Sequence, residues 1–190
     1  MAKESPNTNV SASAEAVLRD ADLIATPEQV GVAYDELARR VDEQLREANP
    51  LVLAVMLGGL IPAAQLLTRL DFPLDIDYVH ATRYRGETRG AELQWLARPS
   101  TSLRGRTVLV VDDILDEGLT LAAVLDWCRQ QGADRVLCAV LVHKDHDRKP
   151  LLSEADFTGL RVPDRYVFGC GMDYLGRFRN LRGIYAVKGL

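Results

Sequence analysis

Three carboxylates stand close together near the middle of the chain, at Asp112, Asp113 and Asp116. They follow the aliphatic run Val108 to Val111, which predicts a buried strand because three of its four residues are β-branched. Carboxylates at the end of a strand can accept hydrogen bonds from sugar hydroxyls, and they can hold Mg²⁺ directly or through water. The spacing therefore indicates a site for a sugar, a metal ion or both.

The residues after these acids suit a phosphate group. Gly118 permits a tight turn, Thr120 supplies a hydroxyl, and an apolar helix is predicted from about Leu119. Backbone N–H groups and the dipole at the start of a helix can hold a phosphate. The alternative is an ordinary strand-to-helix loop in which one aspartate caps the helix. The three acids and the glycine-containing turn together favour a site for a phosphorylated sugar.

The whole run from Val108 to Ala123 resembles the phosphoribosyl-pyrophosphate (PRPP) motif of type I phosphoribosyltransferases. The resemblance implies that Asp116 is the catalytic base, or at least accepts a proton from the purine. The family usually has Ser or Thr where this chain has Glu117, so we expect that side chain to point away from the phosphate while its amide contributes. The residues expected to bind the ribose phosphate of PRPP are Asp112, Asp113, Asp116, Glu117, Gly118, Leu119 and Thr120.

A second predicted strand, Leu51 to Met56, ends in the sequence Leu57-Gly58-Gly59. Two glycines between a strand and a helix let the backbone approach an anion closely, although the same pattern also fits a plain strand-to-helix turn. In the family this loop binds pyrophosphate, and a Lys often stands where this chain has Leu57. Arg179 matches an arginine that meets pyrophosphate in the family.

A long polar loop is predicted after a third strand, Ile76 to Thr82, with residues 92–97 as the return strand of a hairpin. In the family the corresponding loop is mobile and folds over the site, and Arg83 and Tyr84 match its pair near the pyrophosphate. Such a lid excludes water, which would otherwise hydrolyse the substrate. A solvated hairpin tip is the simpler alternative.

Recognition of a base is implied by two further segments. Lys144 follows the predicted strand Val136 to Val142 and matches a lysine that donates to the 6-oxo group of a purine. Such a donor disfavours adenine, whose 6-amino group is itself a donor. The segment from residue 164 to 174 resembles the purine-facing hood of 6-oxopurine phosphoribosyltransferases, which places Tyr166 on the base, Val167 at its edge and Asp173 near a second Mg²⁺. Without the resemblance, Tyr166 would be interpreted as a core aromatic, like Phe168.

The elements between these segments predict an α/β fold. Strand–helix–strand units with short connections indicate a mostly parallel, twisted sheet flanked by helices, with ligands at the carboxyl ends of its strands. The resemblance implies the type I phosphoribosyltransferase fold, with a flexible loop and a small hood lobe. We expect an N-terminal extension over residues 1–25, partly disordered and partly helical from Ser11 to Ala25, and a phosphoribosyltransferase domain over residues 26–190. The hood is expected mainly within residues 157–190, with N-terminal contributions.

Composition limits the function classes. The chain has 190 residues, a net charge of −4 and a pI of about 5.4, which argues against non-specific nucleic-acid binding. Three dispersed cysteines suggest reduced thiols and a cytoplasmic location. No apolar run approaches the ~18 residues of a membrane span, so we expect no membrane association.

The resemblance implies purine salvage: transfer of the 5-phosphoribosyl group from PRPP to hypoxanthine or guanine, giving IMP or GMP and pyrophosphate. Mg²⁺ is the expected cofactor, held by Asp112, Asp113 and Asp173, and the expected assembly is a homodimer or homotetramer. Two alternatives stay open. One is an enzyme for xanthine or another nucleobase. The other is a PRPP-sensing regulator that binds nucleic acid, which the acidic balance opposes but the Arg-rich loop at 83–89 and Leu57 leave possible.

Overall fold

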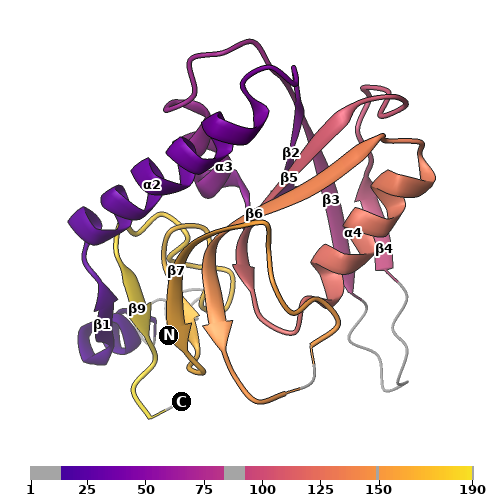
Figure 1. The fold of residues 1–190 in the computed structure, drawn as a ribbon. Helices are drawn as coiled ribbons and strands as arrows, with labels where there is room; N and C mark the ends of the chain where they lie inside the picture. The colour runs from indigo at the N-terminus through magenta and orange to yellow at the C-terminus, as the bar shows by residue number, and fades with distance from the viewer. Residues whose placement is uncertain (1–13, 84–92, 149, 190) are drawn as a thin grey trace, which may run out of the picture.

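The computed structural model describes residues 14–83, 93–148 and 150–189, built around a six-stranded sheet in the order β4-β3-β2-β5-β6-β7 (Figure 1). Neighbouring strands are parallel except β4, which runs antiparallel to β3. β4 is thus the expected return strand. The strands span β2 (Leu51–Met56), β3 (Asp75–Arg83), β4 (Leu93–Ala97), β5 (Thr107–Leu115), β6 (Arg135–Asp145) and β7 (Phe157–Pro163).

Helices cover both faces of this sheet. On one face α2 (Pro27–Leu45) packs against β6 and β7 and α3 (Leu60–Leu67) packs against β2 and β5, while α4 (Leu119–Gln130) packs on the other face. Thr26 caps α2 in a capping box with Gln29. No helix among the described residues is long and apolar enough to cross a membrane.

A second, three-stranded sheet forms the smaller lobe. Its order is β1-β9-β8, with β1 (Asp22–Ala25) antiparallel to β9 (Ile184–Ala186) and β9 antiparallel to β8 (Val167–Phe168). Residues 14–20 are helical, but the expected continuation of that helix to Ala25 is wrong. Residues 22–25 form a strand because they pair with β9. This pairing joins the N-terminal segment to the C-terminal segment in the smaller lobe.

Two strands and the small lobe have boundaries that differ from the sequence-based expectation. β5 continues through Asp112 and Asp113 to Leu115, and β6 continues through Lys144, because these residues keep pairing with neighbouring strands. The sequence predicts that the small lobe begins near Phe157. However, β7 pairs with β6 in the main sheet, so the small lobe begins after Pro163.

Candidate active site

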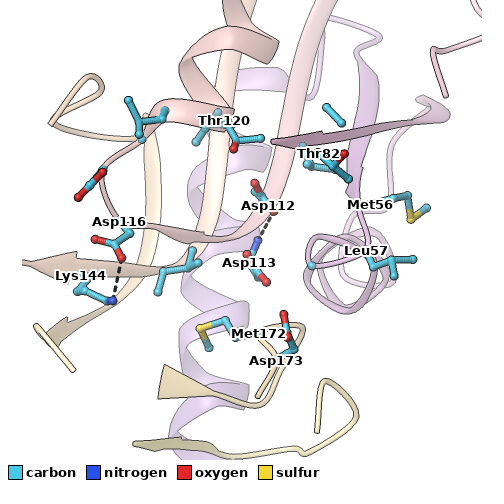
Figure 2. Close-up of a pocket in the computed structure, with 18 of the residues that line it drawn as sticks. Met56, Leu57, Thr82, Asp112, Asp113, Asp116, Thr120, Lys144, Met172 and Asp173 are labelled. Atoms are coloured by element: carbon cyan, nitrogen blue, oxygen red, sulfur yellow. Dashed lines mark hydrogen bonds and ion pairs between the residues drawn. The ribbon is translucent and has the colours of Figure 1, made fainter. Parts of the chain in front are cut away.

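A cavity of about 810 Å³ opens at the carboxyl ends of β2, β3, β5 and β6, beneath the small lobe. Figure 2 shows Asp112 and Asp113 near its centre, Lys144 and Asp116 facing one another on one side, and Met56 and Leu57 on the opposite side. Gly59 is absent from the lining, while Tyr84 and the side chain of Arg83 lie outside the described parts of the chain. The other predicted residues all line it: Leu57, Gly58, Asp112, Asp113, Asp116, Glu117, Gly118, Leu119, Thr120, Lys144, Tyr166, Val167, Asp173 and Arg179.

Two buried carboxylates lie at the centre of the cavity. Asp112 is 9% exposed and Asp113 is 8% exposed. Burial raises the pKa of both carboxyls, and the neighbouring Asp113 charge raises the pKa of Asp112 further. The Asp113 amide donates to Asp112 Oδ1 at 2.9 Å, and Arg179 Nη1 lies 3.7 Å from Asp113 Oδ2. The pair therefore lacks most of the solvation that a carboxylate needs, which favours a cation or hydroxyl donors beside it.

Glycines make room for Asp113. A Cβ on Gly58 would lie 2.2 Å from Asp113 Oδ2, and a Cβ on Gly171 would lie 2.3 Å from the Gly58 carbonyl oxygen. At Gly59 a Cβ would meet the Val111 carbonyl oxygen at 2.4 Å, so this glycine serves the packing of the loop on β5. The close approach that Gly58 and Gly59 allow in this structure is therefore to protein atoms. The peptide bond between Met56 and Leu57 is cis.

The turn from Asp116 to Thr120 leads into α4. Gly118 is the N-cap of that helix with φ +71°, a conformation that favours glycine, and a Cβ there would lie 2.7 Å from Leu152 Cβ. Since glycine has no side chain to cap the helix, the first amides of α4 at the cavity wall need another acceptor. Such amides can bind an anion.

Asp116 is held by two cationic side chains, Lys144 and Arg148, and lies near His146. Lys144 Nζ lies 2.8 Å from its Oδ2, Arg148 Nη2 donates to its Oδ1 at 2.6 Å, and His146 Nε2 lies 3.2 Å from Oδ1. Partial burial alone would raise the pKa of Asp116, but the hydrogen bonds and charges of Lys144 and Arg148 outweigh it, so its pKa is lowered. In this arrangement Asp116 is a weak proton acceptor.

The small lobe contributes an aromatic surface and an ion pair. Tyr166 is 42% exposed and touches Tyr174 edge-on, with 5.8 Å between ring centroids. Phe168 is fully buried, so the core interpretation holds for Phe168 but is wrong for Tyr166. Arg179 Nη2 lies 2.5 Å from Asp173 Oδ1, and its Nη1 donates to the Gly171 carbonyl. Arg179 therefore links Asp173 to Asp113 across the cavity.

Comparison with known proteins identifies the family of this chain. Residues 21–175 match the family model of the phosphoribosyl transferase domain. The chain belongs to this family. Hypoxanthine-guanine phosphoribosyltransferase of Bacillus subtilis is 31% identical over 87% of this chain and 92% of its own length. Hypoxanthine-guanine-xanthine phosphoribosyltransferase of Tritrichomonas foetus is 33% identical over 80% of this chain and 84% of its own.

The fold comparison agrees. The solved structure of hypoxanthine phosphoribosyltransferase from Trypanosoma cruzi, in complex with the product IMP, superposes with a TM-score of 0.81 at 26% identity, covering 90% of this chain and 96% of that one. The chain is therefore a phosphoribosyltransferase enzyme of the type I fold.

Some residues of this phosphoribosyltransferase site escaped sequence reasoning. Arg148 and His146 reach Asp116, whereas the sequence indicated only a charged loop there. Their signal was the charge density of residues 143–149, which says nothing about partners. Thr82 and Met172 also line the cavity. Over the described residues no group of three or more His, Cys, Asp or Glu side chains could hold a metal ion by itself.

Proposed function

We propose that this phosphoribosyltransferase transfers the 5-phosphoribosyl group of PRPP to hypoxanthine or guanine, releasing pyrophosphate and forming IMP or GMP. The supporting observation is that one cavity brings together the acid pair, the turn before α4, Lys144 and the exposed face of Tyr166. The B. subtilis relative is named for hypoxanthine and guanine, and the T. cruzi structure contains the product IMP, which supports the same substrates.

PRPP would lie along the carboxyl edge of the sheet. Asp112 and Asp113 would accept hydrogen bonds from the ribose hydroxyls, while the amides from Asp116 to Thr120 and the Thr120 hydroxyl would hold the 5′-phosphate. The amides of Leu57 and Gly58 and the guanidinium of Arg179 would hold pyrophosphate. The expected part of Gly59 is not supported, because this residue does not line the cavity and its amide donates to the Val55 carbonyl at 2.7 Å.

The donor set fits Mg²⁺ bound together with PRPP. Asp112 and Asp113 are buried carboxylates with raised pKa values, and Asp173 lines the same cavity. Mg²⁺ binds through one or two carboxylates plus substrate phosphates and waters, so it does not need three protein ligands in place beforehand. When bound, Mg²⁺ neutralises the charge that builds up on the departing pyrophosphate.

The purine would stack on Tyr166, with Val167 backbone atoms at its edge and Lys144 donating to oxygen 6. Its nitrogen 9 bonds to carbon 1 of the ribose as the bond from that carbon to pyrophosphate breaks, and the proton at nitrogen 7 passes to Asp116. A positioned base of this kind contributes about 10²- to 10⁴-fold. Because Lys144 is paired with Asp116 in this structure, its movement to the purine oxygen would remove one cation that lowers the pKa of Asp116.

We further propose that residues 26–190 form the phosphoribosyltransferase domain, with β1 completing the hood sheet from the N-terminal side. Assembly as a homodimer or homotetramer and a cytoplasmic location stay predictions.

The direct test is a turnover assay with PRPP and Mg²⁺ in which hypoxanthine, guanine, xanthine and adenine are offered separately. We expect turnover of hypoxanthine or guanine with adenine inert. Turnover of xanthine alone would move the assignment to another nucleobase. PRPP binding without turnover of any base would contradict the proposed activity and favour a PRPP sensor, so nucleic-acid binding would be measured next.

A further inference from the structure

Arg148 connects three acidic side chains around the turn that precedes α4. Its Nη1 and Nη2 donate to the two carboxylate oxygens of Asp164 at 2.9 and 3.0 Å, and Nη2 also donates to Asp116 at 2.6 Å. Its Nε lies 3.4 Å from Oε1 of Glu117. One guanidinium therefore touches the turn at two consecutive residues and the segment that leads to Tyr166.

Glu117 poses an electrostatic problem for an anion at this turn. It lines the cavity next to the amides at the start of α4, where a carboxylate repels a phosphate. The segment after Arg148 also packs on the turn, since the Leu151 amide donates to the Glu117 carbonyl at 2.9 Å and Leu152 fills the space beside Gly118. These contacts of Leu151 and Leu152 hold the segment after Arg148 against the turn, and so keep Arg148 beside Glu117.

We propose that Arg148 is a positioning residue that neutralises Glu117 and so allows the turn from Asp116 to Thr120 to accept the 5′-phosphate of PRPP. This inference rests on the proposed function and deepens it. In place of a neutral hydroxyl residue in the turn, this chain uses an ion pair whose cation comes from the loop after β6. Asp164 holds the other edge of the guanidinium, which fixes its orientation toward the turn.

The test measures PRPP binding in the presence of Mg²⁺ by calorimetry, which needs no turnover. We expect Arg148→Ala to weaken PRPP binding about tenfold, the size expected of one charge acting at ~6 Å on a doubly charged phosphate in a wet site. Adding Glu117→Thr to that variant should restore affinity to within about twofold of the wild type, because the uncompensated charge is gone.

Arg161→Ala is the matched control. Arg161 is 48% exposed against 43% for Arg148, and it also pairs with two carboxylates, Asp145 and Glu154, but neither belongs to the turn. Its loss should leave the dissociation constant of PRPP unchanged.

Two results would overturn the inference: wild-type affinity in Arg148→Ala, or a loss that Glu117→Thr does not restore, since a merely structural role would not depend on residue 117. If Arg148→Ala fails to fold, Glu117→Thr alone decides. It should bind PRPP more tightly than the wild type, and weaker binding contradicts the inference.

A wild-type chain that binds PRPP without turning over any base rejects the proposed activity, while the comparison of Arg148→Ala with the wild type still tests the inference. A wild-type chain that binds no PRPP rejects both.

Discussion

Nζ of Lys144 lies 2.8 Å from Oδ2 of Asp116, so the proposed purine selector and the proposed proton acceptor form an ion pair. Lys144 comes from the end of β6 and Asp116 from the turn after β5, and the parallel pairing of these strands brings the two side chains together. Removal of either residue therefore changes the electrostatics of the other. Substitution of each residue separately distinguishes their roles.

Asp116→Asn tests the proton acceptor. Because the amide keeps the shape of the side chain but cannot take the purine proton, we expect turnover of hypoxanthine to fall by about 10²-fold or more. The dissociation constant of PRPP, measured by calorimetry, should change little. Asp126→Asn, an exposed acid on α4, is the control. Near-normal turnover in Asp116→Asn would remove Asp116 from the role of base.

Lys144→Met tests base selection. A hydrogen bond from a charged donor contributes about 1.5–3 kcal/mol, so we expect kcat/KM for hypoxanthine to fall about 10- to 100-fold while adenine is discriminated against less strongly. Arg148 would still hold Asp116, which limits the disturbance of the turn. The measurement is kcat/KM for both bases, with the exposed Lys188→Met as control. An unchanged ratio between the two bases would contradict selection by Lys144.

Gly58→Ala tests the room that glycine leaves for Asp113. The new Cβ would lie 2.2 Å from Asp113 Oδ2, so the carboxylate or the loop must shift. We expect the free energy of unfolding to fall by about 1–3 kcal/mol, measured in urea, and turnover to fall with it.

Gly31→Ala is the control for that variant. A Cβ there meets no atom within 4 Å, and Gly31 lies inside α2. An alanine in a helix interior should raise the free energy of unfolding by about 0.5–1 kcal/mol. If Gly58→Ala is as stable and as active as the wild type, the packing around Asp113 is less restrictive than the structure indicates.

Asp77 gives a pH-dependent contribution to stability away from the cavity. Burial would raise the pKa of its carboxyl, but hydrogen bonds from the backbone amides of Thr101 and Tyr78 outweigh this and lower it. A carboxyl whose pKa is lower in the folded chain stabilises the fold above its unfolded pKa of about 3.9, and this is lost as pH falls through the folded value.

The measurement is urea unfolding of the wild type and Asp77→Asn across the acid range. The difference in their free energies of unfolding should be constant near neutral pH and should shrink below about pH 4. A difference that stays the same down to about pH 3 would show that the Asp77 hydrogen bonds do not favour its charged form.

The cavity lining at the end of β5 was predictable because its signals are local. The β-branched run before Asp112, the glycine at 118 and the apolar helix after it are neighbours in sequence, and their types restrict the backbone directly. The capping box at the start of α2 is equally local, since Thr26 and Gln29 are three positions apart. These neighbours in sequence do line one cavity in the folded chain, and their chemical roles stay predictions.

Element ends were harder to predict, since they depend on the partner strand. Asp112 and Asp113 interrupt an apolar run, yet β5 continues through them because β6 lies alongside to Leu115. β1 replaced the end of a predicted helix because β9 offered it a partner.

The sequence by itself determined which residue types the site contains: the acids at 112, 113 and 116, the glycine turn and Lys144. Only the tertiary structure decided how they are paired. Arg148 meets Asp116 across 32 residues, and Gly171 encloses Asp113 from the small lobe. The physical reason is that local propensity acts over a few residues, whereas charge compensation and close packing depend on which distant segments the folded sheet brings together.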